Sequence, residues 1–154
     1  MFEGCTSLTD YKSILEPLQL TARCYAYMFK DCTSLKLMPE LKSTFMAPAC
    51  YASMFEGCKS LTSENIYNLK IERVSSYSCA NMFKGCISLT QAPELLATTL
   101  SEYCYASMFK GCISLTQAPE LLAKNLVEGC YSGMFNGCLN LDSIIVGFED
   151  WDYS

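Results

Sequence analysis

The feature that most constrains the fold of this chain is an internal repeat. The segment MFKGCISLTQAPELLA occurs at Met82–Ala97 and again, without a change, at Met108–Ala123. The Met-Phe pair that opens it occurs six times, each time with a cysteine three residues after the Phe, and the pairs begin at Met1, Met28, Met54, Met82, Met108 and Met134. A period of 26 to 28 residues is typical of a solenoid, in which each repeat buries its apolar face against the next. We therefore expect one stacked domain over residues 1–154, with an incomplete first coil.

The residues around each Met-Phe pair predict a short helix. Cys104, Met108 and Cys112 are four residues apart, and Tyr105 and Phe109 have the same spacing, which gives a wide apolar stripe. A glycine follows two residues after most of the Phe residues, where it can end a helix in a left-handed conformation. We expect a helix of about two to three turns in every coil.

The second half of each coil predicts a short strand. The last coil contains L-x-x-I-x-V over Leu141–Val146, the strand signature of leucine-rich repeats. In three other coils a proline should limit the strand to about three residues and shift its register, so that a leucine rather than the neighbouring glutamate faces the core. The three prolines are Pro39, Pro93 and Pro119, and the leucines are Leu41, Leu95 and Leu121. The expected fold class is an α/β repeat, a right-handed leucine-rich-repeat solenoid of about six coils, each a short strand plus a short helix.

Composition excludes several classes of partner. Lys and Arg number 11 against 16 Asp and Glu, and the formal charge of −5 without a basic cluster argues against nucleic acid and anionic membranes. We expect no membrane insertion, because no run of about 18 apolar residues occurs. No signal peptide is visible in this chain. Because Met1 is itself a repeat methionine, we expect a fragment of a longer array, with an irregular acidic and aromatic tail over 147–154 that caps the open end and contains Trp151.

The 11 cysteines follow the repeat. One series lies three residues after each Phe, and the other comprises Cys24, Cys50, Cys104 and Cys130, with Cys79 displaced by one position. We favour two ladders of buried thiols that pack as small apolar side chains. Disulfides between coils are a second interpretation, because stacked coils are about 4.8 Å apart. Zinc is a remote third, since the chain has no histidine and no C-x₂-C pair.

The motif MF-x-G-C-x-S-L-T followed by A-P-E-L resembles the BspA-like leucine-rich repeats of bacterial surface proteins, over essentially the whole chain. The resemblance implies an elongated module, on the cell surface or secreted, that binds protein or glycan on host or neighbouring cells. Related repeats also occur in some parasitic protists.

We expect a non-catalytic recognition or adhesion module that needs no cofactor and no metal. Without histidine, Ser-His and Cys-His nucleophilic pairs are absent. Solenoids usually bind through their strand face, and the residues expected to point outward there are Thr62, Ser63, Thr90, Gln91, Thr116 and Gln117. The alternative function is a structural spacer or self-assembling stalk segment of a larger surface protein, whose coil ends stack on other copies.

Two further binding sites stay open. A cation between Glu94 and Glu120 is the first, with a solvated acidic face as the simpler interpretation. The second is a tyrosine stripe that would bind sugars or peptides if it were exposed, and it comprises Tyr25, Tyr51, Tyr105 and Tyr131.

Overall fold

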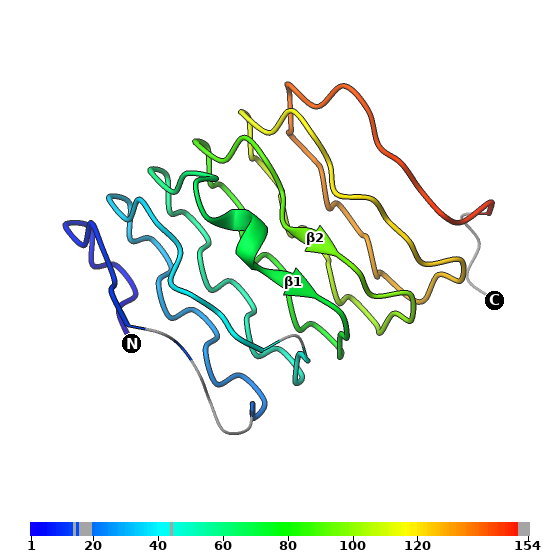
Figure 1. The fold of residues 1–154 in the computed structure, drawn as a ribbon, viewed down its shortest axis with the longest axis horizontal. Coiled ribbons are helices and arrows are strands. Elements are labelled where there is room, and N and C mark those ends of the chain that lie inside the picture. The colour runs from blue at the N-terminus through cyan, green and yellow to red at the C-terminus, as the bar shows by residue number, and fades with distance from the viewer. Residues whose placement is uncertain (14, 16–19, 44, 151–154) are drawn as a thin grey trace.

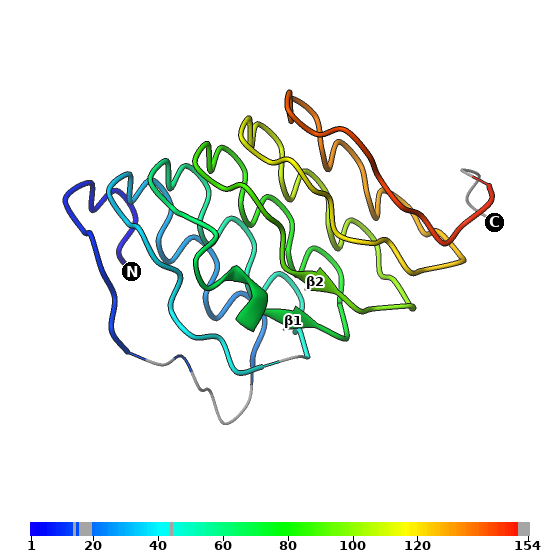
Figure 2. The same ribbon diagram turned by 45° about the horizontal axis from the view of Figure 1, so that its top comes forward.

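A computed structural model describes residues 1–13, 15, 20–43 and 45–150. The coils lie side by side in chain order, with the first coil and the last coil at opposite ends of the array (Figures 1 and 2). We number the coils 1 to 6 by their Met-Phe pairs. Each complete coil has a turn face, made of residues 22–31, 48–57, 76–85, 102–111 and 128–137, and an extended face formed by the rest of the coil. No helix in the described part of the chain is long and apolar enough to cross a membrane.

The turn face is held by two sets of backbone hydrogen bonds that alternate along the chain. In coil 5, the N–H groups of Tyr105, Ser107 and Phe109 donate to carbonyls of coil 6 over 2.7–3.0 Å. The residues between them, such as Met108, donate to the carbonyl three residues earlier in their own coil. In coils 2 to 5 the turn face is thus a series of consecutive β-turns in which about half of the amide groups bind the next coil. From the second residue onward, the N–H groups of these four turn faces are therefore satisfied without a helix.

The predicted helix in each coil is therefore wrong, and so is the expected fold class, an α/β leucine-rich-repeat solenoid with a strand and a helix in each coil. Every fourth residue of the turn face has a left-handed backbone, as at Tyr103 (φ 52°), Ser107 (φ 53°) and Gly111 (φ 75°). A residue with a left-handed backbone conformation reverses the direction in which the chain turns, so the segment cannot continue as a right-handed helix. The helical content of the described residues is one 3₁₀ turn, η1 (Ile66–Asn68), on the extended face.

The extended face is also less regular than the sequence predicts. Its two strands in the described residues, β1 (Lys70–Ile71) and β2 (Glu94–Leu95), pair in parallel. Single parallel bridges join other coils. The strand expected at Leu141–Val146 is not formed, because only Val146 pairs, with Leu121. The register shift expected at the prolines is confirmed: Leu41, Leu95 and Leu121 are buried, and Glu40, Glu94 and Glu120 are exposed.

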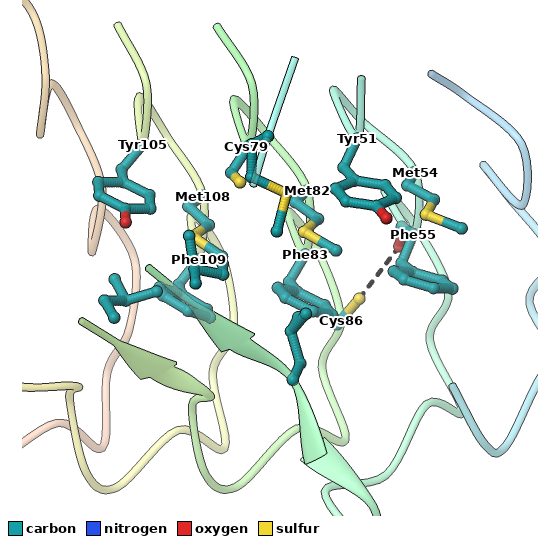
Figure 3. Close-up of a cluster of buried hydrophobic side chains, with 14 of the residues drawn as sticks. Tyr51, Met54, Phe55, Cys79, Met82, Phe83, Cys86, Tyr105, Met108 and Phe109 are labelled. Carbon is teal, nitrogen blue, oxygen red and sulfur yellow. Dashed lines mark hydrogen bonds between the residues drawn. The ribbon is translucent and has the colours of Figure 1, made fainter. Parts of the chain in front are cut away.

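A column of phenylalanine rings forms the centre of the core (Figure 3). Neighbouring rings are stacked with centroids 5.5–5.8 Å apart, from Phe2 through Phe29, Phe55, Phe83 and Phe109 to Phe135. In coils 2 to 6, the cysteine that lies three residues after the Phe of the Met-Phe pair donates its thiol hydrogen to the carbonyl of the equivalent Phe in the preceding coil. Cys86 Sγ, for example, lies 3.1 Å from the oxygen of Phe55.

The cysteines are free thiols in this structure, and eight of the 11 are buried. Burial raises the pKa of Cys50, Cys58, Cys104 and Cys112 to about 12. Cys5 and Cys24 are exposed at the N-terminal end, and Cys138 in the last coil is partly buried. The arrangement agrees with the expected ladders of buried thiols.

The tyrosine stripe is not an exposed surface: Tyr51 and Tyr105 are buried, and Tyr25 and Tyr131 are partly buried. Tyr51 and Tyr105 have 0% and 1% of their surface accessible, so they cannot bind a sugar or peptide. Cys79 takes the equivalent position in coil 4 and separates the two stacked pairs, Tyr25–Tyr51 and Tyr105–Tyr131 (Figure 3).

At the C-terminal end, Phe148 from the predicted tail is buried and stacks on Tyr131 at 6.1 Å. It therefore covers the outer end of the Tyr105–Tyr131 pair. Trp151 lies outside the described residues.

Candidate functional site

The six residues expected to form a binding surface lie together on the extended face, but their hydroxyl groups are occupied. Thr62 Oγ1 and Thr116 Oγ1 each donate to a carbonyl of the preceding coil at 3.2 Å. Ser63 Oγ accepts the N–H groups of Thr90 and Gln91, both at 2.9 Å. The hydroxyl groups of these residues therefore form hydrogen bonds between neighbouring coils. Of the six residues, the exposed side chains without a hydrogen bond among the described residues are those of Gln91 and Gln117, whose backbones form a parallel bridge.

The carboxylates of Glu94 and Glu120 border a hollow of about 360 Å³ on the extended face. Glu94 is already paired with Lys70 at 3.5 Å. Among the described residues, no group of three or more Cys, Asp or Glu side chains is placed to hold a metal ion. Two carboxylates, of which one is neutralised by an ammonium group, make a poor cation site.

A groove of about 410 Å³ lies on the turn face, over coils 2, 3 and 4. Its floor is coil 3, whose outward residues Pro48, Ala49 and Ala52 are all small. Coil 2 contributes Tyr27 to one wall and coil 4 contributes Tyr77 to the other. The groove exists because, at two of the lining positions, coil 3 has a small residue (Ala49 and Ser53) where both flanking coils have a larger one. We call it the turn-face groove.

Aromatic rings dominate its walls. Tyr27 and Tyr77 are 47% and 48% exposed. Lys30 Nζ lies over the Tyr27 ring, 5.6 Å from the centroid. Tyr77 stacks on Tyr103 at 5.0 Å, and the Tyr103 hydroxyl in turn donates to Glu128 Oε1 at 2.8 Å. Each wall therefore presents a tyrosine that is supported by a neighbour and is still open to solvent.

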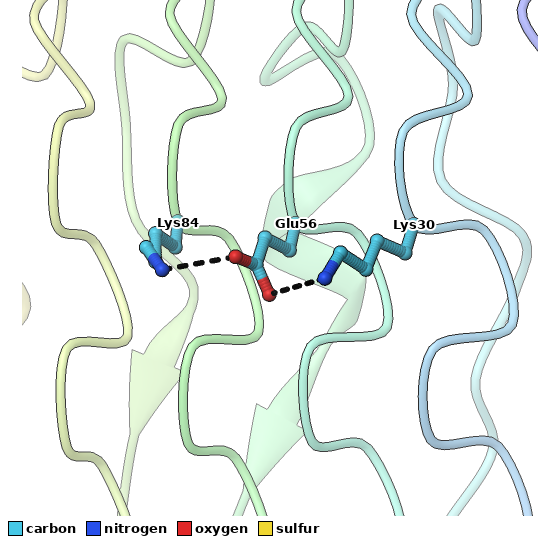
Figure 4. Close-up of polar contacts among 3 residues, drawn as sticks. All are labelled: Lys30, Glu56 and Lys84. Carbon is cyan, nitrogen blue, oxygen red and sulfur yellow. Dashed lines mark ion pairs between the residues drawn. The ribbon is translucent and has the colours of Figure 1, made fainter. Parts of the chain in front are cut away.

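The surroundings of the groove are more positive than the chain as a whole. Arg23 lines it and makes no ion pair with another described residue. Beside the floor, Glu56 lies between two lysines, at 2.9 Å from Lys84 and 3.7 Å from Lys30 (Figure 4). Partial burial opposes ionisation of Glu56, but the hydrogen bond and charge of Lys84, with help from Ser53 and Lys30, lower its pKa overall. Two ammonium groups thus surround one carboxylate, and the guanidinium of Arg23 adds a further positive charge at the groove itself.

Periodicity alone did not reveal this groove. The interpretation of the tyrosines concentrated on those that recur at one position, whereas Tyr27 and Tyr77 occupy different positions in their coils. The available signal was the pair of small residues Ala49 and Ser53 in coil 3, at positions where the two flanking coils have Arg, Tyr or Asn.

The fold and the groove define the molecule as a solenoid of stacked β-turns with one aromatic-walled hollow on its turn face. Comparisons with models of protein families, with curated proteins and with solved structures find no match to this chain.

Proposed function

We propose that the chain is a non-catalytic recognition or adhesion module that acts outside the cell and binds a macromolecule of a host or neighbouring cell. The resemblance of its repeats to those of bacterial surface proteins supports this assignment. The observation that carries it is the turn-face groove, with two half-exposed tyrosines above an alanine floor. A concave, mostly apolar surface with a few polar groups is the usual form of a binding site, and tyrosine is enriched where proteins bind partners.

The proposal predicts that cell binding depends on the two groove tyrosines. The double variant Tyr27→Ala/Tyr77→Ala should reduce binding of the purified chain to host-cell or bacterial monolayers by about tenfold or more, because exposed aromatic anchors often contribute most of the binding energy. The measurement is retention of labelled protein over a concentration series. Tyr67→Ala is the matched control, since Tyr67 is 62% exposed on the extended face, in η1.

The outcome also separates the two candidate surfaces. If Gln91→Ala/Gln117→Ala abolishes binding and the tyrosine variant does not, the extended face is the contact surface and the groove is not. A chain that binds none of the cell types tested, at concentrations up to the millimolar range typical of weak contacts, would contradict the recognition function itself.

A second candidate function, end-to-end stacking as a stalk segment, is favoured by the open face of coil 6. In coils 2 to 5, alternate turn-face amides donate to the next coil. The equivalent amides of coil 6, at Gly129, Tyr131, Gly133, Phe135 and Gly137, have no acceptor among the described residues. A row of unpaired amides is a template for another chain.

Stacking predicts association that depends on concentration. Leu139 is 80% exposed, whereas its equivalent Ile113 is 42% exposed because coil 6 covers it, so a stacked copy should cover Leu139. Sedimentation should therefore show oligomers that Leu139→Lys weakens and Leu122→Lys on the extended face does not. Monomers throughout a wide concentration range would exclude this function.

A further inference from the structure

The lining of the turn-face groove restricts the chemistry of its ligand. Besides alanine methyl groups and tyrosine rings, it offers Arg23, Ser76 and Asn81. No carboxylate lines it, and in the outward row that begins with Ala22, acidic residues occur only from coil 5 onward, at Glu102 and Glu128. In a chain of net charge −5, a hollow that is lined by no acid, and whose one guanidinium makes no ion pair with a described residue, fits a ligand that is neutral over most of its surface and has one negative group.

The backbone of the floor is closed to a peptide strand. Ala49 N–H donates to Ser76, Ala52 N–H donates to Ala49, and the carbonyls of Pro48 and Ala52 accept from coil 2. A ligand that binds by adding a β-strand needs free backbone groups, and the floor has none to offer. Recognition must therefore come from the side chains of the walls.

The dimensions suit a ring held against an aromatic wall. Along the phenylalanine column, the steps from coil 2 to coil 3 and from coil 3 to coil 4 are both 5.6 Å between centroids. The walls thus stand two coil spacings apart. A pyranose ring in its chair form has an apolar C–H face that can lie on a tyrosine and a rim of hydroxyl groups that can reach Asn81 and Ser76. The guanidinium of Arg23 matches a carboxylate in a two-pronged contact.

We infer that the turn-face groove binds a glycan whose sugar ring carries a carboxylate. The ring packs against Tyr77 or Tyr27, the carboxylate binds Arg23, and the hydroxyl groups bind Asn81 and Ser76. This inference rests on the proposed recognition function and names the class of ligand at the same site. Sialic acids and uronic acids share this chemistry.

The test measures binding of immobilised oligosaccharides to the whole chain at two salt concentrations. Sialyllactose and a hyaluronan tetrasaccharide are the carboxylated probes and distinguish the two kinds of acid, while lactose is the neutral counterpart. At least one carboxylated probe should bind at least tenfold more tightly than lactose. High salt should weaken the binding of this carboxylated probe, because salt screens the attraction between its carboxylate and the protein. Arg23→Gln should abolish this preference, Arg23→Lys should retain part of it, and Tyr77→Ala should weaken binding of the acidic probe by about tenfold.

Arg73→Gln is the control, because Arg73 is the other arginine of the chain and lines a separate hollow with Phe45 and Glu72. Lactose that binds as tightly as the acidic probes would overturn the inference. Binding of a proline-rich or acidic peptide through Tyr27 and Tyr77, with no sugar bound, would also overturn it while leaving the recognition function intact. If groove variants change neither sugar binding nor cell binding, the inference and the role of the groove fail together.

Discussion

Raising the pH from 9 to 10.5 is expected to destabilise the folded protein strongly. Four buried thiols have their pKa raised from 9 to about 12 by burial. A group with a raised pKa in the folded state stabilises the fold fully below its unfolded pKa, and that contribution is lost as the pH rises toward the folded value. Each thiol lowers the unfolding free energy by about 1.4 kcal/mol per pH unit in this window. Together the four remove about 5 kcal/mol by pH 10, which is comparable to the stability of many domains.

The effect should be larger than four groups alone provide. Burial also raises the pKa of Cys79 and Cys86 well above 9, and it raises the pKa of Tyr51 and Tyr105, which adds to the loss above pH 10. The measurement is the urea midpoint at pH 7 to 10.5 in the presence of reductant. The slope of the unfolding free energy against pH gives the number of protons released on unfolding, and at least four are expected near pH 10.5.

Two sets of variants test the assignment. Cys58→Ala/Cys112→Ala removes two buried thiols and should reduce the proton release by about two. Cys5→Ser/Cys24→Ser changes two thiols that are exposed in the folded chain, so the slope should stay as it is in the parent. A stability that is constant between pH 8 and 10.5 would show that these thiols are not buried in the folded state.

The sequence predicted which residues face inward better than it predicted the backbone. The Met-Phe-x-x-Cys repeat correctly indicated stacked coils and ladders of buried Phe, Met and Cys side chains. These follow from a fixed spacing, because equivalent residues in successive coils must share an environment. The shift at Pro93 and Pro119 was also predictable, since a carboxylate is costly to bury and a leucine is not.

The backbone was not predicted because a four-residue period and a 3.6-residue period are alike over two turns. Cys104, Met108 and Cys112 would share one side of a helix nearly as well as they share the inner side of the turn face. The distinguishing signal is in coil 6, where Gly129, Gly133 and Gly137 occupy every left-handed position. In the other complete coils two or three of these positions hold residues other than glycine, and residues such as Tyr77 and Ser107 have no marked preference for a positive φ.

The candidate site was harder to predict than the fold. The repeat predicted a binding surface of equivalent residues on the extended face. In the structure, the hydroxyl groups of Thr62 and Thr116 are instead used in hydrogen bonds between coils. The turn-face groove arises where one coil departs from its neighbours, with Ala49 and Ser53 between Tyr27 and Tyr77. Such a hollow depends on which coils are adjacent and on which side chains point outward, and both became clear only when the four-residue period of the backbone was known.

Replacing Phe83 by alanine should cause a large loss of stability, of about 3 to 5 kcal/mol. Its ring is fully buried and stacks on both sides, against Phe55 at 5.6 Å and Phe109 at 5.8 Å. The substitution removes contacts with two coils and leaves a cavity in the middle of the column. Because each coil of a solenoid touches only its neighbours, the cavity also weakens the coupling between the two halves of the array. Urea unfolding gives the change in free energy.

Phe135→Ala is the matched control at the end of the same column. Phe135 stacks on one side only, on Phe109 at 5.8 Å, and is partly exposed, so its replacement should cost about 1 to 2 kcal/mol. If the phenylalanine column transmits stability along the array, the ratio of the two losses should exceed the ratio of the surface that each ring buries. Equal losses at Phe83 and Phe135 would show that the column is not continuous, and the coils would then depend mainly on the turn-face hydrogen bonds for their stacking.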